Sequence, residues 1–318
     1  MGTFKVLLEN QDVLILHGAL GTELEALGYD ISGKLWSAKY LLEEPSIIQD
    51  IHETYIRAGA DLVTTSSYQA TLPGLKEAGL TDAEAREVIA HTVDLAKAAR
   101  ERIWQSLSDA DKSKRPYPLI SGDVGPYAAY LANGSEYSGD YGNISKEDLK
   151  DFHRPRIEIL LEEGVDLLAL ETIPNALEAV ALVELLSEEF PQVEAYLSFT
   201  IQESSSISDG TSLEAVTDLI NSSEQILALG FNCSSPLLFD AALEKLSGLT
   251  DKYLITYPNS GEVYDGQTQT WKPKDVEAKD LVEHSQDWHE QFQVKILGGC
   301  CRTRPNAIQA LYETFRGQ

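Results

Sequence analysis

The chain has 318 residues, enough for a sizeable core and close to the roughly 250 residues typical of a single α/β barrel. Its 51 acidic and 25 basic side chains give a formal net charge of −26 at pH 7. Because this charge would repel a phosphate backbone or an anionic membrane surface, we expect neither nucleic acid nor membrane as a partner.

The sequence shows no sign of export. Its start, MGTFKVLLENQDVLILHGAL, lacks the basic region and cleavage site of a signal peptide, and no apolar run reaches the roughly 18 residues of a membrane span. Three cysteines, a small and odd number, do not make a disulfide framework. We therefore expect a cytoplasmic protein.

Short apolar runs alternate with helical patterns along the chain, each run being followed by a polar or glycine-containing turn. The runs predicted to be strands are 13–18, 62–68, 118–126, 167–174, 194–201, 226–233, 253–259 and 295–301. The predicted helices are 46–58, 81–104, 145–163, 176–189, 211–222, 236–247, 279–292 and 304–316.

The clearest helix is 81–104, whose apolar residues recur at three- and four-residue steps. Thr81 and Glu84 form a capping-box pattern at its start. Pro155 falls inside the predicted helix 145–163 and should start or kink a helix there.

Eight strands alternating with helices, without a linker, predict a (β/α)8 TIM barrel in one domain over residues 1–318. The rival is a doubly wound sheet that binds a dinucleotide. Against it, the first turn, HGALGTELE, carries only Gly18 and Gly21 instead of three spaced glycines. The longest connection, 128–143, is rich in tyrosine and glycine, and we expect it to cover the active mouth.

All three cysteines lie at predicted strand ends, where a barrel places its active site. Cys233 ends the sixth strand, and Cys300 with Cys301 ends the eighth. Three converging thiolates favour zinc and leave a fourth tetrahedral position for a reactant. Gly298 and Gly299 would give the backbone room to turn both neighbouring sulfurs toward one ion.

Other interpretations of the cysteines exist. Free cysteines are also ordinary small buried residues. A disulfide between sequence neighbours is disfavoured by strained geometry. A closed structural zinc site needs a fourth Cys or His, and the sequence places none near either segment.

Several motifs now point to one family. FNC at 231–233, YPNSGE at 257–262 and GGCCRTRPNAI at 298–308 resemble the homocysteine S-methyltransferase family, and the similarity extends over nearly the whole chain. Stretches such as VGPYAAYLANGSEYSGDYG and ETIPN look closest to the branch that uses S-methylmethionine as methyl donor. The resemblance implies that Cys233, Cys300 and Cys301 bind Zn²⁺ and that homocysteine's sulfur takes the open position.

The implied reaction is methyl transfer from S-methylmethionine, with S-adenosylmethionine as another donor, to homocysteine, forming methionine. The zinc stabilises the thiolate, because an unperturbed thiol with a pKa of about 8.5 is mostly protonated at neutral pH. The donor releases a neutral thioether, so no catalytic acid is required. Alternatives are a selenocysteine methyltransferase, a betaine-using relative and a non-catalytic zinc-binding barrel. The partners implied are these small molecules; the oligomeric state is left open.

Further residues are candidates for the substrate site. Glu171, after the fourth strand, could pair with the substrate's ammonium group or be a rim carboxylate bonded to backbone or arginine. Asn259 in YPNSGE and Gly18 in the first turn are assigned to the same site. Arg302, directly after the cysteine pair, could neutralise an anionic site, but we favour a structural role.

Four aromatic residues could form a wall around the sulfonium methyl, because aromatic faces attract cations. Packing in the core is the alternative for each of them. They are Trp36, Tyr68, Tyr127 and Tyr130.

Two residues depart from the family pattern. His17 stands where many members have an aspartate that helps to bind the amino group, and Asp123 stands where serine is commoner. An imidazole nitrogen can accept a hydrogen bond only while it carries no proton, and a protonated imidazole repels an ammonium group.

We therefore predict that His17→Asp strengthens homocysteine binding, because it restores a negative charge for the ammonium group. The measurement is the Michaelis constant for homocysteine, which should fall. A constant that is unchanged or higher would contradict this view of His17.

Overall fold

The computed structural model describes residues 2–32, 35–260, 263–265, 270–272 and 280–317. Its parallel strands form one eight-stranded sheet in the order β1-β10-β7-β6-β5-β4-β3-β2. The strands are β1 Leu14–Ile15, β2 Leu62–Thr64, β3 Leu119–Val124, β4 Leu167–Ile173, β5 Ala195–Phe199, β6 Ile226–Asn232, β7 Tyr253–Tyr257 and β10 Val294–Leu297.

The two outermost strands of this order also meet. Leu16, just after β1, forms a parallel bridge with Leu62 at the start of β2. The His17 amide donates to the Leu62 carbonyl at 3.2 Å, and the Asp61 amide donates to the Ile15 carbonyl at 2.7 Å. The sheet thus closes on itself, which confirms the predicted (β/α)8 barrel.

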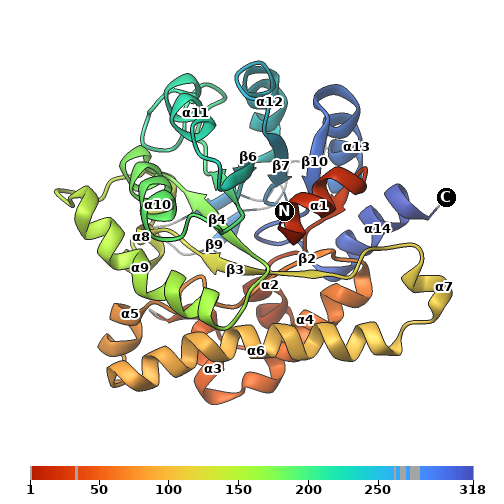
Figure 1. Ribbon diagram of the computed structural model, residues 1–318, viewed down its shortest axis with the longest axis horizontal. Helices are drawn as coiled ribbons and strands as arrows, with labels where there is room; N and C mark the ends of the chain where they lie inside the picture. Colours follow the sequence, from red (N-terminus) through yellow and green to blue (C-terminus); the bar gives the residue numbers. More distant parts are fainter. Residues whose placement is uncertain (1, 33–34, 261–262, 266–269, 273–279, 318) are drawn as a thin grey trace.

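The larger helices surround the strands (Figure 1). They are α4 Pro45–Ala58, α6 Asp82–Ser106, α9 Lys146–Glu162, α10 Ala176–Glu189, α11 Leu213–Asn221, α12 Phe239–Ser247, α13 Leu281–Phe292 and α14 Pro305–Arg316. The shorter elements at the surface and in the loops are α2 Leu20–Ala26, η1 Trp36–Lys39, α3 Tyr40–Glu43, α5 Leu72–Glu77, α7 Asp109–Lys112, α8 Tyr127–Leu131, η2 Ser135–Tyr137 and η3 Pro236–Leu238.

Local signals at the helix ends were informative. At the start of α6 the Thr81 hydroxyl accepts the Glu84 amide and the Glu84 carboxylate accepts the Thr81 amide, so the predicted capping box is present. Pro155 lies inside α9, which begins well before it at Lys146, so the proline does not start the helix.

The strands are shorter than predicted at their carboxyl ends. β10 ends at Leu297, so Cys300 and Cys301 lie in the following loop and not at the end of the strand. The chain leaves the sheet because the Thr303 amide turns back to the Cys300 carbonyl at 3.0 Å. This turn places two consecutive side chains outside the alternating pattern of a strand.

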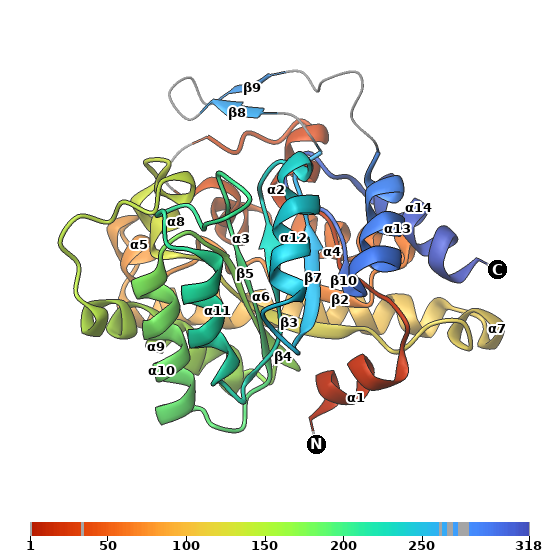
Figure 2. The same cartoon turned by 90° about the horizontal axis from the view of Figure 1, so that it is seen from above.

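Besides most of the short helices given above, two further elements were not predicted. Helix α1, Thr3–Asn10, buries Phe4 and Leu8 completely in the barrel's inner core. A two-stranded antiparallel hairpin, β8 Val263–Asp265 and β9 Thr270–Lys272, follows β7. The two elements lie at opposite ends of the barrel, with the hairpin on the side of the strands' carboxyl ends (Figure 2).

The inner core explains which residues reach the mouth. Leu119 on β3 and Leu167 with Ala169 on β4 belong to the apolar cluster inside the barrel. Since side chains alternate along a strand, Asp123 and Glu171 continue the same inward rows toward the carboxyl ends. The apolar floor therefore gives way to carboxyl groups as the strands approach the mouth.

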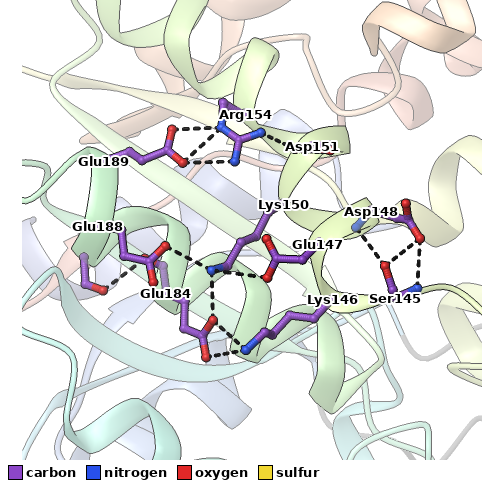
Figure 3. Close-up of polar contacts among 11 residues, drawn as sticks. Ser145, Lys146, Glu147, Asp148, Lys150, Asp151, Arg154, Glu184, Glu188 and Glu189 are labelled. Atoms are coloured by element: carbon purple, nitrogen blue, oxygen red, sulfur yellow. Dashed lines mark hydrogen bonds and ion pairs between the residues drawn. The ribbon is translucent and has the colours of Figure 1, made fainter.

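Ion pairs join the outer faces of α9 and α10, as Figure 3 shows. The Lys150 ammonium group lies 2.9 Å from a Glu184 oxygen and 3.0 Å from a Glu188 oxygen. Arg154 contacts the Glu189 carboxylate at 2.8 Å. These contacts hold α10 against α9, and thereby the end of β4, whose last residues precede α10.

Within the part of the chain that the structure describes, none of the helices combines the length and the apolarity that crossing a membrane requires.

Candidate metal centre and substrate site

The three cysteine sulfurs converge at the mouth. The Sγ atoms of Cys233, Cys300 and Cys301 all lie within 4.8 Å of one another, and those of Cys233 and Cys301 are 3.6 Å apart. All three cysteines are free thiols. With metal–sulfur bonds of about 2.3 Å, the edge of a tetrahedron is about 3.8 Å, so this set fits a soft metal ion.

The end of β7 holds both cysteine segments in place. The Cys300 amide donates to the Pro258 carbonyl at 2.7 Å, and the Ser260 amide donates to the Cys301 carbonyl at 3.1 Å. On the other side, the Asn259 amide donates to the Ser234 carbonyl at 3.1 Å. Backbone bonds through residues 258–260 therefore fix the distance between the two segments.

The backbone of Cys233 itself is unusual. Its φ angle of 47° lies in the left-handed region that residues with a side chain rarely occupy. Its amide still bonds to the Tyr257 carbonyl, at 3.2 Å. Strain of this kind at a site side chain is consistent with a functional requirement for the direction in which the sulfur points.

The glycines before the cysteine pair are needed for space. A Cβ at Gly298 would lie 2.8 Å from the Cβ of Leu16, and one at Gly299 would lie 2.2 Å from the Thr303 side chain. Gly18, after β1, is needed for the same reason, because a Cβ added there would lie 2.7 Å from the Thr303 carbonyl oxygen. The first and last strand ends can therefore approach each other only with glycine at these positions.

Hydrogen bonds around the sulfurs favour ionisation of one of them. Contacts from Cys233 and Cys300 lower the pKa of the Cys301 thiol. The Tyr137 hydroxyl lies 3.9 Å from the Cys233 sulfur. A thiolate is the form in which cysteine binds metal.

Glu171 lies at the mouth beside this centre. Burial raises the pKa of its carboxyl group to about 7, a hydrogen bond from the Tyr257 hydroxyl at 3.1 Å opposes the rise, and the charge of Cys233 adds to it. The next residue, Thr172, has a φ angle of 62° and is held by the Asn232 side chain, which accepts its amide at 3.0 Å. The β6 residue before Cys233 thus fixes the turn that presents Glu171.

Tyr68 is the predicted aromatic residue that the structure brings to this centre. Burial raises the pKa of its hydroxyl, and the charges of Glu136, Cys233 and Glu171 act on it in the same direction. Glu136 comes from the long 128–143 connection, which is tied to β5 because Thr200 donates to the Glu136 carbonyl at 2.7 Å. The expected covering of the mouth by this connection is present.

Trp36 packs against helix α2. Its ring packs so closely against α2 that a Cβ on Gly21 would lie 2.6 Å from the indole. Its φ angle of 46° is left-handed, and the residue is half-buried. Trp36 therefore has both a packing contact and a partly open face.

Tyr127 and Tyr130 belong to a different cluster. Both rings pack against Phe152 of α9, at centroid distances of 5.1 and 5.6 Å. The Tyr130 hydroxyl donates to Glu77 at 2.5 Å. None of the contacts described for these two tyrosines reaches the cysteines or Glu171.

His17 is half-buried beside the glycine turn. Its Nδ1 atom contacts the Gly18 carbonyl oxygen, while Nε2 is buried and has no hydrogen-bond partner in the described part of the chain. Burial lowers the pKa of His17 to about 4. The imidazole is therefore neutral near pH 7 and does not repel an ammonium group by charge.

The two remaining candidates differ in their roles. The buried Asn259 lies between the cysteine segments, and its Oδ1 has no partner among the described residues. Arg302 donates to Glu25 of α2 at 3.0 Å, and its amide donates to the Thr22 hydroxyl at 2.9 Å. This agrees with the favoured structural role for Arg302, which ties the cysteine loop to α2.

Sequence reasoning missed several residues at the centre. Tyr137 and Glu136 lie in the connection that was expected to cover the mouth, but its composition does not say which side chains turn inward. Tyr257 and Asn232 lay within predicted strands, and they are the last residues of β7 and β6. The alternation of side chains along a strand was the only sign that they face inward.

Comparison with known proteins decides the family. A model of the homocysteine S-methyltransferase family matches residues 14–315. The chain belongs to this family. Homocysteine S-methyltransferase of Escherichia coli (strain K12) is 45% identical over 96% of this chain and 96% of its own length, and homocysteine S-methyltransferase 1 of Arabidopsis thaliana is 43% identical over 93% and 91%.

A solved structure of a homocysteine S-methyltransferase family member shares the fold. The homocysteine methyltransferase MmuM from Escherichia coli, in a metallated form, superposes with a TM-score of 0.86 at 43% sequence identity, covering 98% of this chain and 99% of that one. In the present chain, Cys233, Cys300 and Cys301 form a group that could hold a metal ion.

Acid should destabilise this homocysteine S-methyltransferase family member through His52. The side chain is 2% exposed, and burial lowers its pKa from 6.5 to about 3, with the charge of His17 as the second cause. As the pH falls through 6.5, His52 takes up a proton in the unfolded chain but not in the folded chain. The contribution of His52 to the free energy of unfolding is therefore fully present above that pH. It falls as the pH drops toward 3, by up to about 1.4 kcal/mol per pH unit.

The measurement is urea unfolding of the metal-free protein between about pH 7 and about pH 4.5. Removing the metal excludes loss of cysteine ligation as the cause. His52→Leu should flatten the dependence of the unfolding free energy on pH. Equal slopes for the wild type and the variant would show that His52 is not responsible.

Proposed function

We propose that the chain transfers a methyl group from S-methylmethionine to the sulfur of homocysteine, forming methionine and releasing a second methionine from the donor. The observation that carries the proposal is the set of three cysteine sulfurs within 4.8 Å of one another at the barrel mouth, beside the Glu171 carboxyl group. Soft ligands for a metal and an acceptor for an ammonium group are the two features that an amino-acid thiol requires.

We propose Zn²⁺ as the metal that Cys233, Cys300 and Cys301 would hold. Three sulfur donors suit zinc better than magnesium or calcium, which prefer oxygen. Bound there, zinc would stabilise the substrate's sulfur as a thiolate at neutral pH. The free thiols favour a reducing compartment, and we place the protein in the cytoplasm.

The chain's own residues position the thiol substrate. The Glu171 carboxylate would accept hydrogen bonds from the ammonium group, and its contact with Tyr257 keeps it oriented. Asn259, whose Oδ1 is unpaired among the described residues, and the backbone at Gly18 lie close enough to the cysteine loop to contact the same substrate. His17, neutral near pH 7, would contribute only a weak acceptor.

The positively charged sulfonium group of S-methylmethionine is attracted by aromatic rings and by acidic side chains. The charges of Glu136 and Cys233 both act on Tyr68, so we assign Tyr68 to the donor site together with the half-buried Trp36. Tyr127 and Tyr130 take no part, because they pack on α9 instead. The leaving thioether is neutral, so the work left to the protein is in-line alignment of the two sulfurs and the methyl carbon.

Replacing one cysteine tests the proposal. Loss of even an outer partner of a metal site costs about 10- to 100-fold, so Cys300→Ser should lose its zinc and more than about 100-fold of its activity. Zinc content and methionine formation would be measured with S-methylmethionine, S-adenosylmethionine and betaine as donors. We expect one zinc per wild-type chain and the fastest reaction with S-methylmethionine.

Glu25→Gln is the matched control, because it removes the ion pair of Arg302 next to the cysteines without touching a sulfur. It should keep zinc and activity. Full activity of Cys300→Ser would refute the metal assignment. Zinc in the wild type without product from any donor would refute the proposed enzyme and favour a non-catalytic zinc-binding barrel.

A further inference from the structure

A second carboxyl group lies deeper in the barrel than Glu171. Asp123, on β3, is 4% exposed, and its Oδ1 atom is buried without a hydrogen-bond partner among the described residues. Its backbone is fixed on both sides, since its amide donates to the Thr65 hydroxyl at 2.9 Å and its carbonyl accepts the Ser67 hydroxyl at 2.8 Å. A buried carboxyl oxygen without a donor is costly, which makes it a marker for a missing partner.

Asp123 faces Glu171 across neighbouring strands. Asp123 pairs in register with Ala169, and Glu171 lies two residues farther along β4, on the same inward face. The two groups also interact electrostatically: burial, and then the charge of Glu171, raise the pKa of Asp123. The pair therefore forms a lower and an upper carboxyl group along one wall of the mouth.

The cation nearest to this pair is already engaged elsewhere. The charge of Arg156 favours ionised Asp123, yet its guanidinium donates to the carbonyls of Tyr68 at 3.0 Å and Ser67 at 3.2 Å, and also to Gly125. Among the described residues, no ion pair between Arg156 and Asp123 is formed. A cation that enters the mouth would supply the countercharge that the two carboxyl groups lack.

We propose that Asp123 and Glu171 together bind the ammonium group of the amino-acid thiol, Glu171 from the rim and Asp123 from below. An ammonium group carries three donors, so it can satisfy both carboxyl groups at once. The inference rests on the proposed function for the identity of the thiol. The inference adds that Asp123 and Glu171 together allow the protein to distinguish an amino-acid thiol from a thiol without an amino group.

The test measures binding and not turnover, so it stands apart from the methyl-transfer proposal. Homocysteine, S-methylmethionine and 4-mercaptobutanoate are titrated calorimetrically into the zinc-loaded protein. The last compound has the thiol and carboxylate of homocysteine but lacks the amino group. Since a hydrogen bond to a charged group is worth about a factor of ten or more, Asp123→Asn should weaken homocysteine binding about tenfold. Binding of 4-mercaptobutanoate should stay unchanged.

Ser121→Ala is the control, because Ser121 is two residues earlier on β3 and its buried hydroxyl also lacks a described partner. It should bind both thiols as the wild type does. Asp123→Ser repeats the test if the asparagine variant does not fold.

Three results would overturn the assignment of Asp123. The first is unchanged homocysteine affinity in the variants. The second is equal weakening for both thiols, which indicates a structural role, and the third is weakening confined to S-methylmethionine. Failure of the wild type to form methionine, with the binding pattern intact, would overturn only the proposed reaction.

Discussion

The site depends on one constraint, namely that the carboxyl ends of β6, β7 and β10 must approach closely enough for three sulfurs to meet. Backbone bonds from residues 258–260 connect the Cys233 segment to the Cys300 and Cys301 segment. Gly298 permits the approach because the chain of β1 leaves no space for a side chain there. The distance of 3.6 Å between the Cys233 and Cys301 sulfurs is therefore set mainly by how the backbone segments pack.

The same geometry brings several acidic groups close together. Sulfurs, Glu171, Asp123 and Glu136 gather negative charge at a partly buried mouth, and burial raises the pKa of all three carboxyl groups. Such a collection is stable only with protons or with cations. A metal ion, the ammonium group of homocysteine and a sulfonium donor are all cations, so the metal and the substrates of the proposed reaction would supply this positive charge.

Sequence patterns predicted the barrel and the meeting of the cysteines, because alternation of strands and helices fixes which ends share a face. They did not predict that Cys300 and Cys301 leave the strand, since the turn at Thr303 is set by contacts with β7 and α2. Tyr127 and Tyr130 illustrate the limit for aromatic residues: composition marks the ring, but only packing against Phe152 decides where it lies. Helix α1 and the β8–β9 hairpin escaped prediction altogether.

X-ray absorption spectroscopy at the zinc edge tests the central claim most directly, because it counts the sulfur atoms around the metal. The zinc-loaded protein should show three sulfur neighbours at about 2.3 Å, and addition of homocysteine should raise the number to four. Fewer than three sulfurs in the protein alone, or an unchanged number with homocysteine, would contradict the account.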